Sequence, residues 1–190
     1  CAGGGSGSAT VDFGSSGEIE ISGNAMPIAD GDNSPATADH SDFGSVTAGS
    51  TFTRTFTITN SHPTLALSIS GVSVTGAADF SLLTPPAGSV AANGGTTTFT
   101  VQFAPNAVGP VSATVTVNSS DCDEQPYDFA IAGLGACLAP AFTACPAGPL
   151  TSVAEAGSCA APMTYTVTAA GVPAPTLSYT LAGATMNSGS

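Results

Sequence analysis

The stretch that decides the fold is TFTRTFTIT, residues 51–59. Threonine occupies every odd position, while Phe52, Phe56 and Ile58 share the even positions. Successive side chains of a β-strand point to opposite faces, whereas a helix would scatter these residues around its circumference. The alternation therefore predicts a half-buried strand with one apolar face and one threonine face.

The same period of two recurs along much of the chain, and no stretch has a convincing helical period. Further strands are predicted at Glu18–Ile21, Phe43–Val46, Leu65–Val74, Phe80–Leu83, Thr96–Phe103, Val111–Val117 and Tyr127–Ile131. Gly71 interrupts the alternation, which indicates a bulge or a tight bend. Turn residues such as Asn93-Gly94-Gly95 separate the strands. About seven strands in roughly 120 residues describe an all-β fold, an immunoglobulin-like β-sandwich.

The domain organisation follows from changes in composition. The sandwich is expected to span residues 17–135. Residues 136–190 contain three cysteines among prolines and then resume the alternation, which predicts a second, incomplete immunoglobulin-like β-module. These 55 residues are few for a sandwich with its own core. Residues 1–16 are rich in Gly and Ser, and they are either a flexible linker or the segment that completes the tail module of a neighbouring copy.

Five cysteines in a chain rich in Thr, Ser and Gly indicate an oxidising compartment, and hence an extracellular or cell-surface location. Cys122 and Cys137 bracket a predicted strand, so they lie too far apart for a bridge, whose Cα atoms must lie within about 7 Å. Cys145 and Cys159 are the pair expected within the chain. If the tail joins the first residues of a neighbour, four cysteines form two bridges and Cys122 is the single remainder. Those four are Cys1, Cys137, Cys145 and Cys159.

The charge balance excludes several classes of partner. The chain has 13 acidic residues and one Lys or Arg, which gives a net charge of −12. Nucleic-acid affinity and attraction to anionic membranes both depend on Lys and Arg, so neither partner is expected. No run of 18 or more apolar residues predicts a membrane-spanning helix. No positively charged leader precedes Arg54, so the chain is expected to be mature or a segment of something longer.

Catalytic residues were sought among the titratable groups. The two histidines, His40 and His62, fall in predicted loops, and both are expected at the surface. No G-x-S-x-G motif accompanies them, so we expect no enzyme and no required cofactor. The cysteines lack a C-x-x-C spacing, which favours disulfides over zinc.

Two acidic loops are candidate calcium sites, because calcium prefers several oxygen ligands. In the first loop the expected ligands are Asp30, Asp32, Asp39 and Asp42. In the second they are Asp121, Asp123 and Glu124. The alternative for both is a solvated loop in which the aspartates cap turns.

Arg54 is unusual because it shares the strand parity of Phe52, Phe56 and Ile58. A cation on the buried face of a strand should be paired with an acid or lie at the rim of the sheet. Three interpretations stay open: the rim, a structural ion pair, and ligand recognition.

A resemblance to a known family joins these observations. Its blocks are Glu18–Asn24, Ile28–Asp32, Asp42–Val46, Thr53–Asn60, Val74–Phe80, Gly95–Phe103 and Asp123–Ile131. Together they resemble the choice-of-anchor D domain, a bacterial relative of the immunoglobulin-like ASH/MSP group. The tail resembles a hyalin-repeat (HYR) module at Cys145-Pro146, Gly157–Cys159, Met163–Val167 and Gly183–Thr185. The resemblance implies tandem units of large secreted or surface-anchored bacterial proteins, and it implies no chemistry.

The expected function is therefore structural. The chain is interpreted as a repeat unit of an extracellular bacterial fibre or giant surface adhesin, in which copies associate head to tail or follow one another as tandem repeats. One alternative is a calcium-dependent adhesive module that binds glycan or protein. Another is a surface lipoprotein with a lipid on Cys1.

Overall fold

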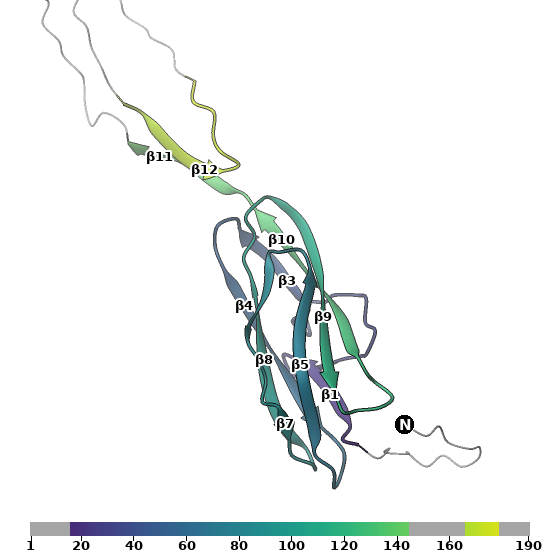
Figure 1. Cartoon of the computed structure of the whole chain (residues 1–190). Helices are drawn as coiled ribbons and strands as arrows, with labels where there is room; N and C mark the ends of the chain where they lie inside the picture. Colours follow the sequence, from purple (N-terminus) through teal and green to yellow (C-terminus); the bar gives the residue numbers. More distant parts are fainter. Residues whose placement is uncertain (1–15, 145–165, 179–190) are drawn as a thin grey trace, which may run out of the picture. The chain divides into compact units, whose positions relative to one another are not determined.

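A computed structural model of the chain describes residues 16–144 and 166–178. The chain forms two compact units, residues 1–136 and 137–190 (Figure 1). Every regular element in the described part is a β-strand, so the predicted all-β fold is confirmed. The division after Ala136 compares with an expected domain end at Gly135.

The first sheet of the first unit has five strands in the order β2-β1-β4-β8-β6, and all its pairs are antiparallel. Their bounds are β1 Ile19–Gly23, β2 Met26–Ile28, β4 Phe52–Asn60, β6 Phe80–Thr84 and β8 Gly95–Phe103. The central β4–β8 pair runs in continuous register from Phe52 opposite Phe103 to Asn60 opposite Gly95. This register places the apolar residues of both strands on the same face.

The second sheet has the order β3-β10-β9-β5-β7. Its strands are β3 Asp42–Thr47, β5 Leu67–Gly76, β7 Ser89–Val90, β9 Gly109–Ser119 and β10 Tyr127–Ala136. The β3–β10 pair is parallel, and the other pairs are antiparallel. The predicted bulge at Gly71 is confirmed, since the β5–β9 register shifts between Ile69 and Gly71.

The core between the two sheets is built mainly from phenylalanine and β-branched residues. Its six buried phenylalanines are Phe43, Phe56, Phe80, Phe99, Phe103 and Phe129. Phe56 stacks on Phe99 and also contacts Phe129, with a centroid separation of 5.3 Å in each pair. A second group joins Phe80 and Phe103 at 4.6 Å. Full burial of one such side chain contributes about 1.5–3 kcal/mol, so these rings dominate the cohesion of the unit.

Some expectations from the sequence need correction. Phe52 shares the parity of the buried residues, yet it is 39% exposed because it stands at the beginning of β4. The short strands β2 and β7 escaped the sequence analysis, because three and two residues are too few to display a period of two.

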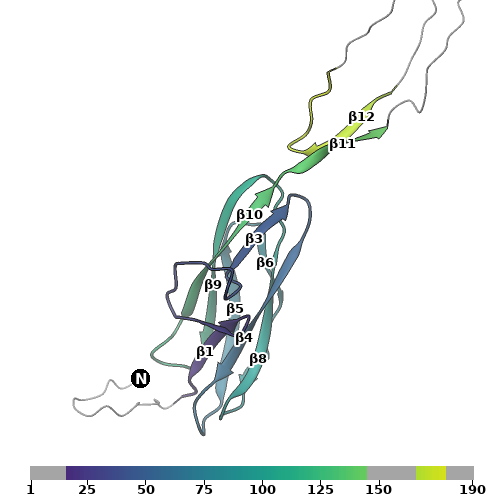
Figure 2. The ribbon, with the colours of Figure 1, turned by 180° about the vertical axis from the view of Figure 1, so that it is seen from behind.

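A loop of residues 33–41 interrupts the parallel edge of the second sheet. Asp32 first forms a parallel bridge with Phe129 of β10; the chain then leaves the sheet and returns as β3 beside the same strand. Figure 2 shows this excursion as a dark loop at the side of the sandwich. It packs against the end of β1, where a Cβ on Gly23 would lie only 1.8 Å from the Asp39 carbonyl oxygen. Glycine at position 23 therefore allows residues 39 and 40 to approach the first sheet.

In the second unit, the described residues form the antiparallel pair β11 (Leu138–Ala144) and β12 (Thr168–Val172). All seven residues of β11 are exposed. The predicted Cys145–Cys159 pair lies outside the described residues, as does Cys1.

Candidate functional site

The first acidic loop does not gather its four carboxylates. Each one instead accepts hydrogen bonds from nearby backbone or side-chain groups. The bonds are Asp128 N to Asp30 Oδ1 at 2.8 Å, Ser34 N to Asp32 Oδ1 at 2.9 Å, Ser41 N to Asp39 Oδ1 at 2.9 Å and Gly44 N to Asp42 Oδ1 at 2.8 Å. The bonds of Asp32, Asp39 and Asp42 reach two positions ahead, which is the turn-capping arrangement that was the alternative to calcium. The Asp30 bond instead links the loop to Asp128 of β10. Calcium binding by this loop stays a prediction, without a shared cluster to support it.

The second acidic loop does form a cluster, with a member that the sequence analysis missed. Carboxylate oxygens of Glu18, Asp121 and Asp123 lie within 4.8 Å of one another. Asp121 is only 1% exposed, and its Oδ2 accepts a hydrogen bond from the Ile19 amide at 2.8 Å. This bond joins the beginning of β1 to the loop after β9 across 102 positions of sequence, so no local pattern could predict that Glu18 belongs here.

Burial and mutual repulsion raise the pKa of several carboxyl groups at this end of the sandwich. Burial raises the pKa of Asp121, and the nearby Asp123 carboxylate raises it further, while the hydrogen bond from Ile19 lowers it. Burial, with the charges of Asp121 and Asp123, also raises the pKa of Glu18. For Glu124, burial and the charges of Asp121 and Glu18 raise the pKa to about 7. A bound divalent cation would relieve the same repulsion, because it prefers clustered carboxylate oxygens.

Asn60 links this end of the sandwich to the loops around it. It is fully buried at the end of β4. Its Oδ1 accepts hydrogen bonds from the amides of Glu18 at 3.1 Å and His62 at 3.2 Å. Its Nδ2 donates to the carbonyls of Leu65 at 2.8 Å, Val90 at 3.2 Å and Ala91 at 3.2 Å. One side chain therefore holds three separate segments.

The expectation that His62 lies at the surface is wrong. His62 is buried, and its Nδ1 accepts hydrogen bonds from the amides of Thr64 at 3.1 Å and Leu65 at 2.9 Å. The imidazole thus shapes the turn that follows β4. His40 is half-buried near the other end of the same strand, so the two histidines do not meet.

Arg54 is the third residue of β4 and lies opposite Val101 of β8. It is half-buried, and its guanidinium carbon lies 4.7 Å from the centre of the exposed Phe52 ring. It forms no ion pair with any residue of 16–144 or 166–178. The described residues therefore do not support the interpretation of Arg54 as part of a structural ion pair.

The cysteines differ from their expected roles. Cys122 is disulfide-bonded, although it was expected as the remainder. Cys137 is free and exposed, although the joining of the tail to a neighbouring copy would place it in a bridge. The spacing along the strand excludes a bridge between Cys122 and Cys137, but it does not identify the partner of Cys122.

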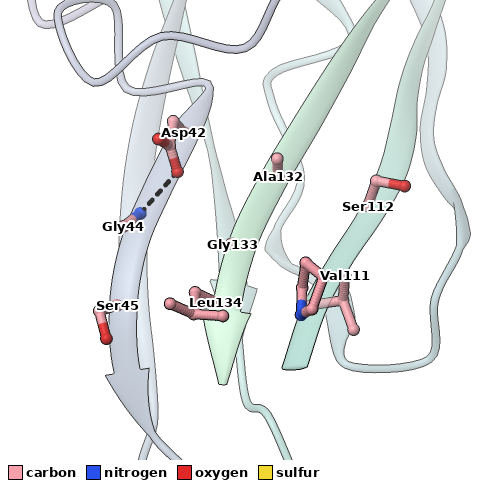
Figure 3. A pocket seen from close by; sticks show the side chains of 9 residues that line it. Asp42, Gly44, Ser45, Val111, Ser112, Ala132, Gly133 and Leu134 are labelled. Carbon is pink, nitrogen blue, oxygen red and sulfur yellow. Dashed lines mark hydrogen bonds between the residues drawn. The ribbon is translucent and has the colours of Figure 1, made fainter. Parts of the chain in front are cut away.

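The outer face of the second sheet carries a shallow groove of about 680 Å³ (Figure 3). Small residues on β3, β9 and β10 leave this space, among them Gly44, Ser112 and Ala132. Leu134, at one side of it, is 44% exposed. Asp42 is the one titratable group in the lining, and it accepts the hydrogen bond from the Gly44 amide, so this groove holds no acid–base pair.

Comparison with known families decides the classification of the first unit. The profile of the HYDIN/CFA65/VesB-like Ig-like domain matches residues 36–133, which is more than half of the chain. The chain belongs to this Ig-like family. The predicted immunoglobulin-like fold is thereby confirmed.

Three solved structures with similar folds are each distant in sequence. An ASH/PapD-like domain of human CEP192 is 15% identical with a TM-score of 0.39, over 62% of this chain and 84% of that one. The secreted serine protease VesC from Vibrio cholerae is 14% identical with a TM-score of 0.42, over 52% of this chain and 22% of the protease. The C. elegans MSP family member WR4 is 10% identical with a TM-score of 0.32, over 52% of this chain and 94% of that one. No curated protein sequence matches the chain. The described residues contain no helix that is long and apolar enough to cross a membrane.

The raised pKa of Glu124 predicts how the stability of this Ig-like domain depends on pH. Folding raises the pKa from 4.5 to about 7, so the folded state binds more protons between these values. Stability should therefore increase as the pH falls from about 7 towards about 4.5. Glu124→Gln should raise the melting temperature at about pH 8 and lose this advantage near pH 5. Thermal melts at both values check this, with Glu20→Gln as the control, and an equal effect at both would contradict it.

Proposed function

We propose that the chain is a structural repeat unit of an extracellular bacterial fibre or giant surface adhesin. In this proposal the Ig-like sandwich is a choice-of-anchor D-like spacer, and the second unit is an HYR-like module that follows it. The partners are other copies of the chain, associated head to tail or as tandem repeats. In this role the outer surfaces of the strands make the contacts, and no chemical reaction is involved.

The observation that supports this proposal best is the outer face of the first sheet. Its threonines lie directly opposite one another on β4 and β8. The pairs are Thr55 with Thr100, Thr57 with Thr98 and Thr59 with Thr96. The first pair brings its hydroxyl oxygens to 3.3 Å. Glu20 of β1 is exposed beside Thr59 on the same face, but the strip formed by β4 and β8 carries no charge there. In a chain of net charge −12, two copies can bring such strips together with less repulsion than acidic surfaces would meet.

The second unit adds support for association between copies. Its described strands form one antiparallel pair, and β11 is exposed along its whole length. A strand whose edge is open can accept a strand from another chain. A neighbouring copy is the partner that a repeat unit would supply.

The test is the assembly state of the complete chain. We expect concentration-dependent assemblies in sedimentation velocity and elongated particles in electron micrographs. Thr57→Lys places a charge on the threonine face and should reduce assembly. Thr114→Lys is the matched control, because Thr114 is equally half-buried but lies on the outer face of the second sheet. A chain that stays monomeric at all concentrations would sink the proposal.

A second candidate function is a calcium-dependent adhesive module, and the cluster of Glu18, Asp121 and Asp123 favours it. Extracellular calcium modules have dissociation constants of about 0.1–1 mM. Calcium at about ten times such a value should therefore raise the melting temperature by several degrees. Asp123→Asn should abolish the effect, whereas Asp30→Asn in the first acidic loop should leave it unchanged. A melting temperature that ignores calcium would rule this candidate out.

A further inference from the structure

The two buried side-chain nitrogens without a hydrogen-bond partner in the described residues belong to Arg54 and His40. They are Arg54 Nε and His40 Nδ1. Buried polar groups nearly always have partners, so each exception requires an explanation. These two exceptions come from the sole Arg of the chain and from one of its two histidines. Their coincidence at one place indicates a site whose partner is not part of the described protein.

The fold brings the two residues together at the end of a strand. β1 ends at Gly23, opposite Phe56 of β4, so the part of β4 that contains Arg54 continues beyond it. The loop of residues 33–41 covers this position, with the His40 Cβ only 3.2 Å from where a Cβ on Gly23 would lie. His40 itself has a φ of +68°, a conformation that non-glycine residues rarely adopt. Such backbone strain persists where the surroundings impose it and is common at binding sites.

The electrostatics leave the guanidinium without an acid. Burial lowers the pKa of His40, and the Arg54 charge lowers it further, while Asp39 raises it. The Asp39 carboxylate is already engaged, since it accepts hydrogen bonds from the Ser41 amide at 2.9 Å and the Ser41 hydroxyl at 2.5 Å. On the other side, the Phe52 ring lies 4.7 Å from the Arg54 guanidinium carbon and limits its movement. Arg54 is therefore positioned but not neutralised.

We infer that Arg54 and His40 form a binding site for a carboxylate. The planar guanidinium matches the two oxygens of a carboxylate, and charge-assisted hydrogen bonds of this kind are about twice as strong as neutral ones. The neutral imidazole can supply one further N–H donor. Both side chains are half-buried, so part of each still faces solvent. Arg54 Nε and His40 Nδ1 themselves are covered, so a carboxylate binds them only when the Arg54 side chain turns toward it.

Two sources can supply this carboxylate. One is a small organic acid in solution. The other is an Asp or Glu side chain of a second copy, since the chain carries 13 acidic residues for its single Arg. The second source rests on the proposed function, whereas the first is independent of it.

The first arm of the test uses the complete chain with labelled arginine and histidine, followed by NMR during titration with sodium acetate. We expect a saturable shift of the Arg54 Nε and His40 ring signals, with the His62 ring as an internal control. Sodium chloride at the same ionic strength should not reproduce the shift. Arg54→Gln should abolish the His40 response, and Arg54→Lys, which retains the charge without the planar fork, should weaken it. The amide spectrum of each variant reports whether it is folded.

The second arm identifies the source. Without added acid, the Arg54 Nε signal is followed as the protein concentration rises at low salt, in parallel with sedimentation. A shift that follows association assigns the carboxylate to a second copy, and a response to acetate alone assigns it to a free acid. No response in either arm, or an equal response to chloride, would mean that water alone occupies the site and would overturn the inference. If sedimentation shows that the unaltered chain stays monomeric, the proposed function fails, and the acetate arm still decides this site.

Discussion

Replacing Phe56 by alanine should lower the free energy of unfolding by about 3–5 kcal/mol. Phe56 is fully buried at the middle of the core, where it contacts Phe99 and Phe129. Its removal loses the transfer free energy of the ring and leaves a cavity that rigid neighbouring strands cannot fill. Denaturant unfolding followed by circular dichroism measures the effect, since the chain contains no Trp for fluorescence.

Phe52→Ala is the matched control for this prediction. Phe52 lies four positions earlier on the same strand, has the same parity and is 39% exposed. Its removal should cost well under half as much, because much of its surface already contacts water. Equal losses for the two variants would show that the core does not lie where the burial of β4 places it.

Replacing Asn60 by alanine should cost about 3–5 kcal/mol, even though it removes only a small side chain. Asn60 makes five hydrogen bonds, so the variant leaves several buried amides and carbonyls without a partner. Each unsatisfied buried group costs about 1–3 kcal/mol, partly offset where water can enter. Thermal and denaturant unfolding measure the loss. Hydrogen exchange should show the largest increase at the amides of Glu18 and His62.

Asn106→Ala makes the same chemical change at an exposed position and should alter stability by less than about 0.5 kcal/mol. If Asn60→Ala were equally mild, the three segments that meet at Asn60 would have to be held by other contacts. The exchange of the His62 amide separates these cases, because that amide depends directly on the Asn60 oxygen.

The strands were predictable because alternation is a local property. In TFTRTFTIT, the position of each Thr and each apolar residue indicates which face of the strand it lies on. The register of β4 and β8 then places Phe56 opposite Phe99. Even the bulge at Gly71 could be read from one break in the pattern. Alternation predicted burial less well at the ends of strands. Phe52 has the parity of the buried residues, but it stands at the beginning of β4 and is largely exposed.

The candidate sites were predicted less well, since they depend on contacts between distant segments. The sequence analysis grouped acids that are neighbours in the chain, yet Asp121 is joined to the beginning of β1 across 102 positions. In the same way, the loop of residues 33–41 reaches the end of β1 only because Gly23 leaves room for it. Composition and alternation were sufficient for the all-β class and the strand faces, because both arise from burial along one segment. The acidic cluster, the buried His62 and the meeting of His40 with Arg54 came from the folded packing, because chain connectivity alone says nothing about which loops pack against which strand ends.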